Sequence, residues 1–200
     1  MPYAFGDALG SFADSSLKLL PMPANVPNAT ATAAALTAST EWQWCSFDGL
    51  SSADLYAILA QRQDVFVVEQ NCVFQDIDGI DQQSHHLLAW QTSPSGTRVL
   101  AAYLRCVAPG IKYPECSLGR VMTARAARGS GLGKLLFAEG VRRAALTYPG
   151  CGVRISAQQY LEVFYQGFGF ETCSAPYLED DIWHVEMLRP GSPPTAAGST

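Results

Sequence analysis

The residues with the clearest chemical signature are 128–134, which read Arg-Gly-Ser-Gly-Leu-Gly-Lys. They follow a run typical of a β-strand, residues 118–123, and open a run with helical spacing, residues 134–148. Glycines at such a junction leave backbone N–H groups uncovered at the start of a helix, where the helix dipole adds partial positive charge. The pattern predicts an anion site, most often for phosphate.

Two familiar phosphate loops do not fit this stretch. A Walker A loop needs a glycine where Arg128 stands and a Ser or Thr where Leu135 stands. A dinucleotide-binding fingerprint needs a third glycine where Lys134 stands. What is left is Arg-x-x-Gly-x-Gly, and the alternative at this point is a glycine-rich turn that caps a helix without a ligand.

The bulk composition is that of a globular protein with one α/β domain. The chain has 200 residues, of which 48% are hydrophobic and 16% are charged. A net charge of −5 without a basic stripe argues against a nucleic-acid partner. Six cysteines without a C-x-x-C pair indicate reduced thiols rather than a disulfide scaffold. No apolar run reaches the roughly 18 residues needed to cross a bilayer, so we expect no membrane partner.

The two ends of the chain differ in composition from the rest. Residues 1–40 are rich in Ala, Thr, Ser and Pro and predict a flexible extension, and residues 190–200 predict a similar tail. Residues 41–189 are the expected domain. The extension matches neither a secretory signal nor an Arg-rich presequence. We therefore expect a cytoplasmic protein, with organelle targeting by the extension left open.

Hydrophobic periodicity predicts an alternating α/β pattern along the domain. A helix should begin at the capping Ser51 and continue through residue 70. A helix is also expected over 134–148 and a short one over 161–168. Strands are expected at 42–47, 86–90, 99–107, 118–123, 153–157 and 182–188. The order β-α-β-β-β-α-β-α-β predicts a three-layer mixed sheet with helices on both faces.

A second motif gives the glycine loop a context. Residues 164–170 read Phe-Tyr-Gln-Gly-Phe-Gly-Phe, some thirty residues after the loop. A strand, an R-x-x-G-x-G loop, a helix, a strand and then F-Y-x-x-x-G-F resemble the GNAT family of N-acetyltransferases. The resemblance covers residues 41–189. It implies an α/β (α+β) fold with a mixed, mostly antiparallel twisted sheet, and acetyl-CoA as the acyl donor.

The resemblance also implies roles for individual residues. The pyrophosphate of acetyl-CoA would lie on the backbone of the glycine loop, and the pantetheine arm on the strand before it. Tyr165 would stand near the CoA sulfur, where a phenol with an ordinary pKa of about 10 can donate a proton to the leaving thiolate. The alternative is that Tyr165 only packs beside Phe164. The cofactor-binding residues are then Val121, Met122, Thr123, Arg128, Gly129, Ser130, Gly131, Leu132, Gly133 and Lys134.

Further stretches resemble a narrower group, the ElaA-type branch of the GNAT proteins. They are R-x-x-V-F-V-V-E-Q from Arg62, Q-D-I-D-G from Gln75, L-G-R-V from Leu118, and the pair Ala157-Gln158. Gln158 stands where many GNAT members have Asn, and it fits this branch.

The general base and the acceptor are less constrained. Glu69 is the candidate base, because the end of the first helix borders the acceptor site in this fold; the alternative is a carboxylate paired with Arg62. Arg62, Asp76, Asp78 and Gln158 are the candidate substrate residues, since acidic side chains attract a cationic amine. The spacing of the acids does not match a calcium loop, and no metal is predicted.

Three functions were compatible with these motifs. The leading one is transfer of an acetyl group from acetyl-CoA to a primary amine of a small molecule or peptide, by direct attack, in a monomer or homodimer. The second is a non-catalytic acyl-CoA-binding or sensing module. The third is an acyl-homoserine-lactone-like synthase, suggested by R-x-x-V-F and weakened by the R-x-x-G-x-G loop.

Overall fold

The computed structural model describes residues 39–72, 74–179 and 181–191. Its sheet has the strand order β1-β2-β3-β4-β5-β8-β6, and β7 pairs with β8 beside this path. The predicted flexible extension falls on residues 1–38 and the predicted tail on 192–200, which lie outside the described ranges. Regular structure in the described part begins at Glu41 and ends at Arg189.

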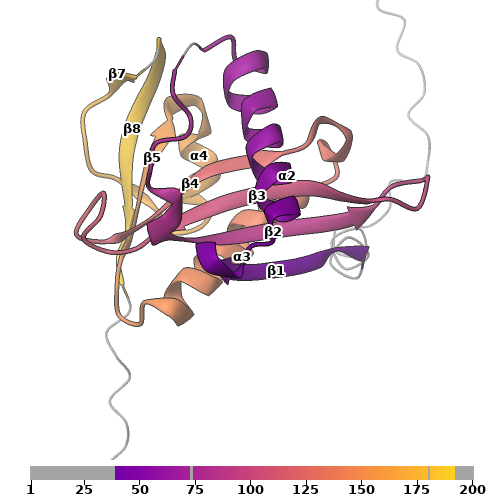
Figure 1. The fold of residues 1–200 in the computed structure, drawn as a ribbon. Coiled ribbons are helices and arrows are strands. Elements are labelled where there is room, and N and C mark those ends of the chain that lie inside the picture. Colours follow the sequence, from indigo (N-terminus) through magenta and orange to yellow (C-terminus); the bar gives the residue numbers. More distant parts are fainter. Residues whose placement is uncertain (1–38, 73, 180, 192–200) are drawn as a thin grey trace, which may run out of the picture.

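Most of the strand pairs are antiparallel, and the pair β4–β5 is parallel. This confirms the expected mixed, mostly antiparallel sheet of an α/β fold (Figure 1). β6 and β7 were not predicted, because strands of two or three residues are too short to show alternation. The strands are β1 (Glu41–Ser46), β2 (Ser84–Thr92), β3 (Arg98–Val107), β4 (Cys116–Thr123), β5 (Val153–Gln158), β6 (Glu171–Thr172), β7 (Tyr177–Glu179) and β8 (Ile182–Arg189).

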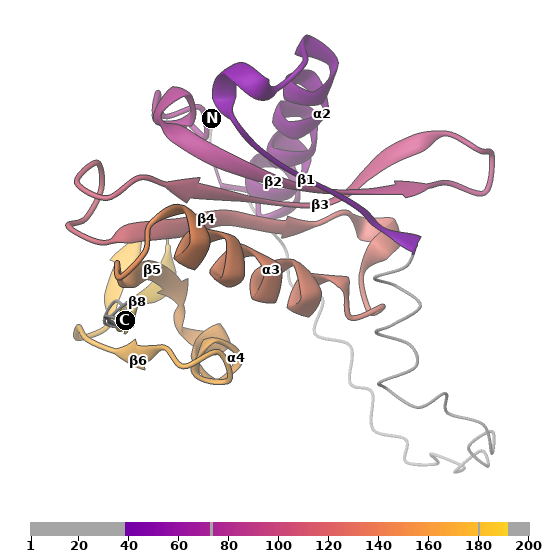
Figure 2. The ribbon, with the colours of Figure 1, turned by 90° about the horizontal axis from the view of Figure 1, so that it is seen from below.

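Helices cover both faces of the sheet, as predicted. Figure 2 shows α2 (Ser52–Arg62) on one face, with α3 (Leu132–Thr147) and α4 (Glu162–Gln166) on the other. Single 3₁₀ turns lie at η1 (Phe47–Gly49), η3 (Asp81–Gln83), η4 (Arg125–Ala127) and η5 (Gln159–Leu161).

The sheet separates two apolar clusters. On β2, Leu87 joins the cluster that contains Phe137 of α3, whereas the next residue, Leu88, joins the cluster that contains Ile58 of α2. Successive side chains of a strand point to opposite faces, so a strand covered on both sides must be apolar throughout. This is why β2 and β3 read as nearly unbroken hydrophobic runs.

The first helix differs from the prediction after its first three turns. Ser51 caps it as expected, accepting a hydrogen bond from the Asp54 backbone N–H at 3.0 Å. The α-helix ends at Arg62, and the following segment η2 (Gln63–Glu69) is a π-helix rather than a continuation. This segment carries three valines, whose branched side chains crowd the preceding turn of an α-helix. α3 also begins at Leu132, two residues earlier than predicted.

The feature of the sheet that creates space for a site is the parting of β4 and β5. These strands pair only at Cys116–Val153 and Ser117–Arg154 and separate beyond that point. β4 also carries a bulge on its other side, where the register with β3 shifts between Tyr103 and Arg105. The remainder of β4 therefore has backbone groups on the edge that faces β5 without a described strand partner.

Candidate functional site

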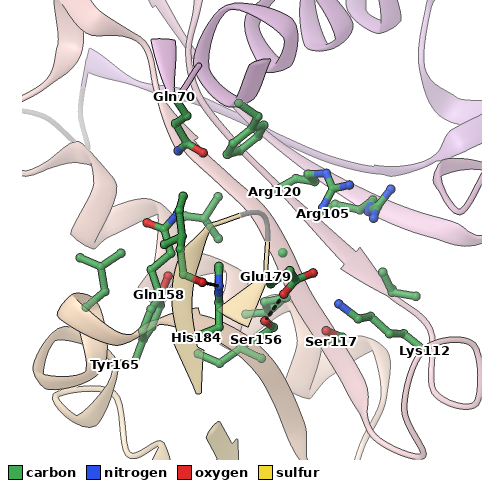
Figure 3. A pocket seen from close by; sticks show the side chains of 18 of the residues that line it. Gln70, Arg105, Lys112, Ser117, Arg120, Ser156, Gln158, Tyr165, Glu179 and His184 are labelled. Atoms are coloured by element: carbon green, nitrogen blue, oxygen red, sulfur yellow. Dashed lines mark hydrogen bonds between the residues drawn. The ribbon is translucent and has the colours of Figure 1, made fainter. Parts of the chain in front are cut away.

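A cavity of about 210 Å³ opens where β4 and β5 part (Figure 3). Its walls come from the middle of β4, the ends of β5 and β8, the π-helix with the loop after it, and α4. Segments far apart in the sequence therefore meet around one space. The predicted site residues can be placed relative to this cavity.

The glycine loop lies at the N-terminus of α3, as the sequence predicted. Gly129 and Gly131 have φ angles of 73° and 92°, in the left-handed region that favours glycine. Among the described residues, no acceptor is recorded for the backbone N–H of Gly129, Ser130, Gly131 or Gly133. Unpaired N–H groups at a helix N-terminus fit an anion such as a pyrophosphate.

The loop also packs tightly onto the end of β4. A Cβ added to Gly133 would lie 3.1 Å from Thr123 Oγ1, so only glycine fits there without displacement. Val121 lines the cavity, while the side chain of Met122 is buried in the α2 cluster. Met122 can therefore contact a ligand in this cavity only through its backbone. This is the kind of contact expected for the strand that precedes the loop.

Tyr165 lies on α4 at the parting of the two strands. Its ring packs against Phe137 with 4.9 Å between centroids, and only 8% of the residue is exposed. The residue lines the cavity, and its hydroxyl has no hydrogen-bond partner among the described residues. Burial raises the pKa of Tyr165 to about 12. Tyr165 thus both packs in the core and presents a protonated hydroxyl at the cavity.

The expectation that Arg62 contacts a substrate is not supported by its position. The side chain is fully buried, and the residue does not line the cavity. Its guanidinium donates to the Asp76 carboxylate at 2.7 Å, to the Asp81 carboxylate at 2.7 Å and to the Asp76 carbonyl at 2.8 Å. These bonds use all three nitrogens of the guanidinium group. Arg62 therefore anchors the acidic loop, the loop before β2 that carries Asp76, Asp78 and Asp81, to the end of α2.

Asp76 and Asp78 are also placed differently from a site that attracts a cationic amine. Asp78 accepts two hydrogen bonds from Arg105, at 2.7 and 2.6 Å, and Asp76 lies 2.6 Å from Arg120 Nε. Burial opposes ionisation of Asp78, but the arginine contacts outweigh it and hold its pKa well below the usual range. The charges of both aspartates are therefore balanced by arginines within the protein. Neither aspartate lines the cavity.

Glu69, the candidate base, is paired with Arg128 and not with Arg62. Arg128 Nη2 donates to Glu69 Oε2 at 2.9 Å, and Arg128 Nε donates to the Thr123 carbonyl at 3.0 Å. The bond from Arg128 lowers the pKa of Glu69, which makes its carboxylate a weaker proton acceptor. Glu69 does not line the cavity. The ion pair joins the π-helix to the glycine loop.

Gln158, a candidate substrate residue, does line the cavity, opposite His184 in the β5–β8 ladder. His184 also lines it, and its Nδ1 lies 2.8 Å from the Ile182 carbonyl oxygen. A carbonyl oxygen only accepts, so Nδ1 donates this bond, and no partner is recorded for Nε2 among the described residues. The sequence analysis did not identify His184 as a residue of the cavity.

The fold agrees with comparisons to known proteins. A family model described as an acetyltransferase (GNAT) domain matches residues 64–189. The chain belongs to the GNAT family. It is also 38% identical over 151 residues to Protein ElaA of Escherichia coli, across 74% of this chain and 95% of that protein. The UPF0039 protein sll0451 of Synechocystis is 40% identical over 147 residues, across 74% and 93% of the two chains.

Solved structures give the same assignment. An acyl-CoA N-acyltransferase from Pseudomonas aeruginosa is 39% identical with a TM-score of 0.71, across 76% of this chain and 99% of that one. Escherichia coli ElaA is 37% identical with a TM-score of 0.69, across 75% and 99%. The protein is thus a GNAT acyltransferase of the ElaA-like branch. Within the described ranges, its structure contains no helix with the length and apolar character of a membrane span.

GNAT proteins typically use acyl-CoA donors, and the loop described above has the unpaired N–H groups that such a donor needs. The sequence motifs did not reveal five charged or titratable residues of the cavity: Arg105, Lys112, Arg120, Glu179 and His184. The available signal was weak. Arg120 occurs in the L-G-R-V stretch that resembled the ElaA branch, but nothing in its neighbourhood indicated which way its side chain points.

Proposed function

We propose that this GNAT protein transfers an acetyl group from acetyl-CoA to a primary amine of a small molecule or peptide by direct attack. The observation that carries the proposal is the edge of β4 that β5 leaves open, because it runs from the cavity wall at Val121 to Thr123, on which the glycine loop packs. The unpaired N–H groups of the loop lie at one end of this edge, and the unpartnered hydroxyl of Tyr165 lies at the cavity. Together they offer a phosphate site, an edge for an extended chain and a proton donor.

The donor would be held mainly by the backbone. Its pyrophosphate would accept hydrogen bonds from the loop between Arg128 and Leu132, with Gly133 and Lys134 opening the helix beneath it. Its pantetheine arm would lie along the open edge of β4, from Val121 to Thr123. In this arrangement the thioester end is directed into the cavity, toward Tyr165.

The chemistry requires a neutral amine and a protonated leaving group. The amine nitrogen attacks the thioester carbonyl, the C–S bond breaks, and the thiolate takes the proton of Tyr165. The nitrogen gives up one proton, which restores the tyrosine hydroxyl. Because its pKa is raised to about 12, Tyr165 holds its proton at neutral pH and can donate it to that sulfur. An amide and the free thiol of CoA are the products.

His184 is the proposed acceptor for the proton that the ammonium group must lose before the neutral amine attacks. Its Nδ1 donates to the Ile182 carbonyl, which leaves Nε2 as the nitrogen that can take up this proton, and the residue lines the cavity. Glu69 is less suited, because Arg128 occupies its carboxylate and it lies outside the cavity lining. The base is therefore assigned to the β8 side of the cavity rather than to the π-helix.

Release of CoA thiol from acetyl-CoA by a panel of primary amines tests this function. Tyr165→Phe keeps the ring that packs on Phe137 and should lower kcat by about 100-fold at saturating acetyl-CoA, since proton donation contributes on that order. Tyr56→Phe is the matched control, because Tyr56 is 78% exposed on α2, and it should leave kcat unchanged. Acetyl-CoA binding without amine-dependent thiol release would favour the sensing module instead.

A further inference from the structure

The acidic loop places a cationic surface at the cavity. The carboxylates of Asp76, Asp78 and Asp81 bind arginines, and none of these three residues lines the cavity. Two of those arginines, Arg105 and Arg120, do line it. The loop therefore works as a scaffold that holds two guanidinium groups at the wall of the cavity.

These guanidinium groups have donors that the loop does not use. The side chain of Arg105 is 4% exposed, and its buried Nε has no hydrogen-bond acceptor among the described residues. Arg120 Nη1 likewise has no recorded acceptor among them, whereas Nη2 donates to the Asp76 carbonyl and Nε lies 2.6 Å from Asp76 Oδ1 in an ion pair without hydrogen-bond geometry. A buried cation with an unused donor costs free energy, and such sites in proteins call for an explanation.

The backbone of Arg120 points to the same conclusion. Its φ angle is 51°, in the left-handed region that non-glycine residues rarely adopt. It lies in the β4 bulge, where two residues of one strand face one residue of the other and a side chain is directed away from its regular position. Strained backbone of this kind persists where the surrounding structure enforces it, and it occurs preferentially at ligand sites.

A third cation completes this surface. Lys112, in the connection between β3 and β4, lines the cavity and is in no recorded ion pair with a described residue. Its ammonium lies 5.3 Å from the centre of the Tyr113 ring. Arg105, Lys112 and Arg120 together are called the cationic wall. Figure 3 shows Arg105 and Arg120 next to each other, away from Tyr165 and Gln158.

The opposite side of the cavity carries a negative charge, which complements the cationic wall. It is formed by β5, β7 and β8, with Ser156, Glu179 and His184. Ser156 Oγ lies 3.1 Å from Glu179 Oε2, so this side carries a carboxylate as well as the imidazole of His184. An ammonium group is favoured on this side and an anion on the cationic wall.

We propose that the acceptor is a primary amine that also carries an anionic group, a carboxylate or a phosphate, which binds the cationic wall. This inference rests on the proposed acetyl transfer and names the class of amine that it uses. The amine would lie toward His184 and Glu179, where it loses its proton, and the anionic group toward Lys112 and Arg120. Charge-assisted hydrogen bonds to such a group are stronger than neutral ones.

The test compares pairs of primary amines in which one member carries an anionic group and the other does not. Thiol release from saturating acetyl-CoA is measured for glycine against glycinamide, β-alanine against β-alaninamide, and phosphoethanolamine against ethanolamine. The anionic member of at least one pair should have the higher kcat/KM, by about tenfold or more. The amino-acid pairs and the phosphate pair separate the two possible anions.

Lys112→Gln identifies the group that recognises the charge. It should raise KM for the anionic amine by about tenfold and leave KM for the neutral member and for acetyl-CoA unchanged. Arg142→Gln removes one positive charge from α3, where the side chain is 54% exposed, and should change none of these values. Lys112 forms no recorded ion pair with a described residue, so its substitution leaves the ion pairs of the acidic loop intact.

The outcomes distinguish this inference from the function on which it rests. Equal use of both members of every pair, or a Lys112→Gln effect of the same size on anionic and neutral amines, overturns the cationic wall as an acceptor site and leaves acetyl transfer intact. If no amine releases thiol, the proposed function itself is overturned.

Discussion

The proposed donor site and the cationic wall of the cavity are built by different means. The proposed donor site is a run of six residues, 128–133, whose contribution is backbone N–H groups at the start of α3. Arg105 and Arg120 of the cationic wall are held by ion pairs that join side chains of α2, β3, β4 and the acidic loop. One site depends on local conformation and the other on contacts between distant segments.

This difference has an energetic counterpart. Arg128, Gly129 and Gly131 of the glycine loop are exposed, so a change at these positions alters a few backbone groups and little packing. Arg62 and Arg105 are almost fully buried, with side chains 0% and 4% exposed, and share Asp81. Removing one charge from such a network leaves its partner buried without compensation, which is more costly than the loss of the bond itself.

The largest effect should come from breaking that network. Arg62→Met keeps an unbranched apolar stem but leaves Asp76 and Asp81 without their buried partner. We expect it to lower the free energy of unfolding by about 3–5 kcal/mol, measured by urea denaturation followed by circular dichroism.

A surface ion pair provides the matched control for Arg62→Met. Arg142→Met removes a partner of Glu139 on the exposed side of α3 and should leave the urea midpoint nearly unchanged, because exposed ion pairs contribute little to stability. A similar small loss in both variants would mean that the acidic loop is not held in place by its buried ion pairs. The contrast between the glycine loop and the ion-paired cationic wall would then have no energetic basis.

The same contrast explains what the sequence could predict. The turn of the glycine loop at the start of a helix, the short helix that carries Tyr165 and the order of the longer elements along the chain could be predicted, because each is encoded within a few neighbouring residues. The roles of Arg62 and Asp76 were misjudged because a buried ion pair and an exposed charge look alike in a sequence. Arg105, from a strand that reads as apolar, gave no local sign that it reaches the cavity.

A second comparison concerns the base, since the two candidates lie on different elements. His184→Gln should lower kcat by about 100-fold, because the proposed acceptor of the amine proton is lost. Glu69→Gln should leave kcat unchanged, because Arg128 already holds that carboxylate. Both are measured as amine-dependent thiol release at saturating acetyl-CoA. The reverse result, a large loss of kcat for Glu69→Gln alone, would identify Glu69 of the π-helix as the general base.

The smallest effect should come from the donor loop, and a pair of glycines isolates it. Gly129 and Gly96 have similar φ angles, 73° and 83°, and a Cβ on either would meet no atom within 4 Å. Alanine at either position therefore imposes the same kind of backbone strain, about 1–2 kcal/mol of stability. Only Gly129 lies in the loop proposed to bind pyrophosphate, whereas Gly96 lies in the β2–β3 hairpin.

Gly129→Ala should therefore raise KM for acetyl-CoA several-fold, because relief of the strain turns an N–H group away from the phosphate, with little change in kcat. Gly96→Ala should lower stability to a similar degree and leave KM unchanged. Steady-state kinetics and urea denaturation on the same preparations separate the two effects. Equal KM values in the two variants would show that the loop, despite its unpaired N–H groups, does not hold the donor.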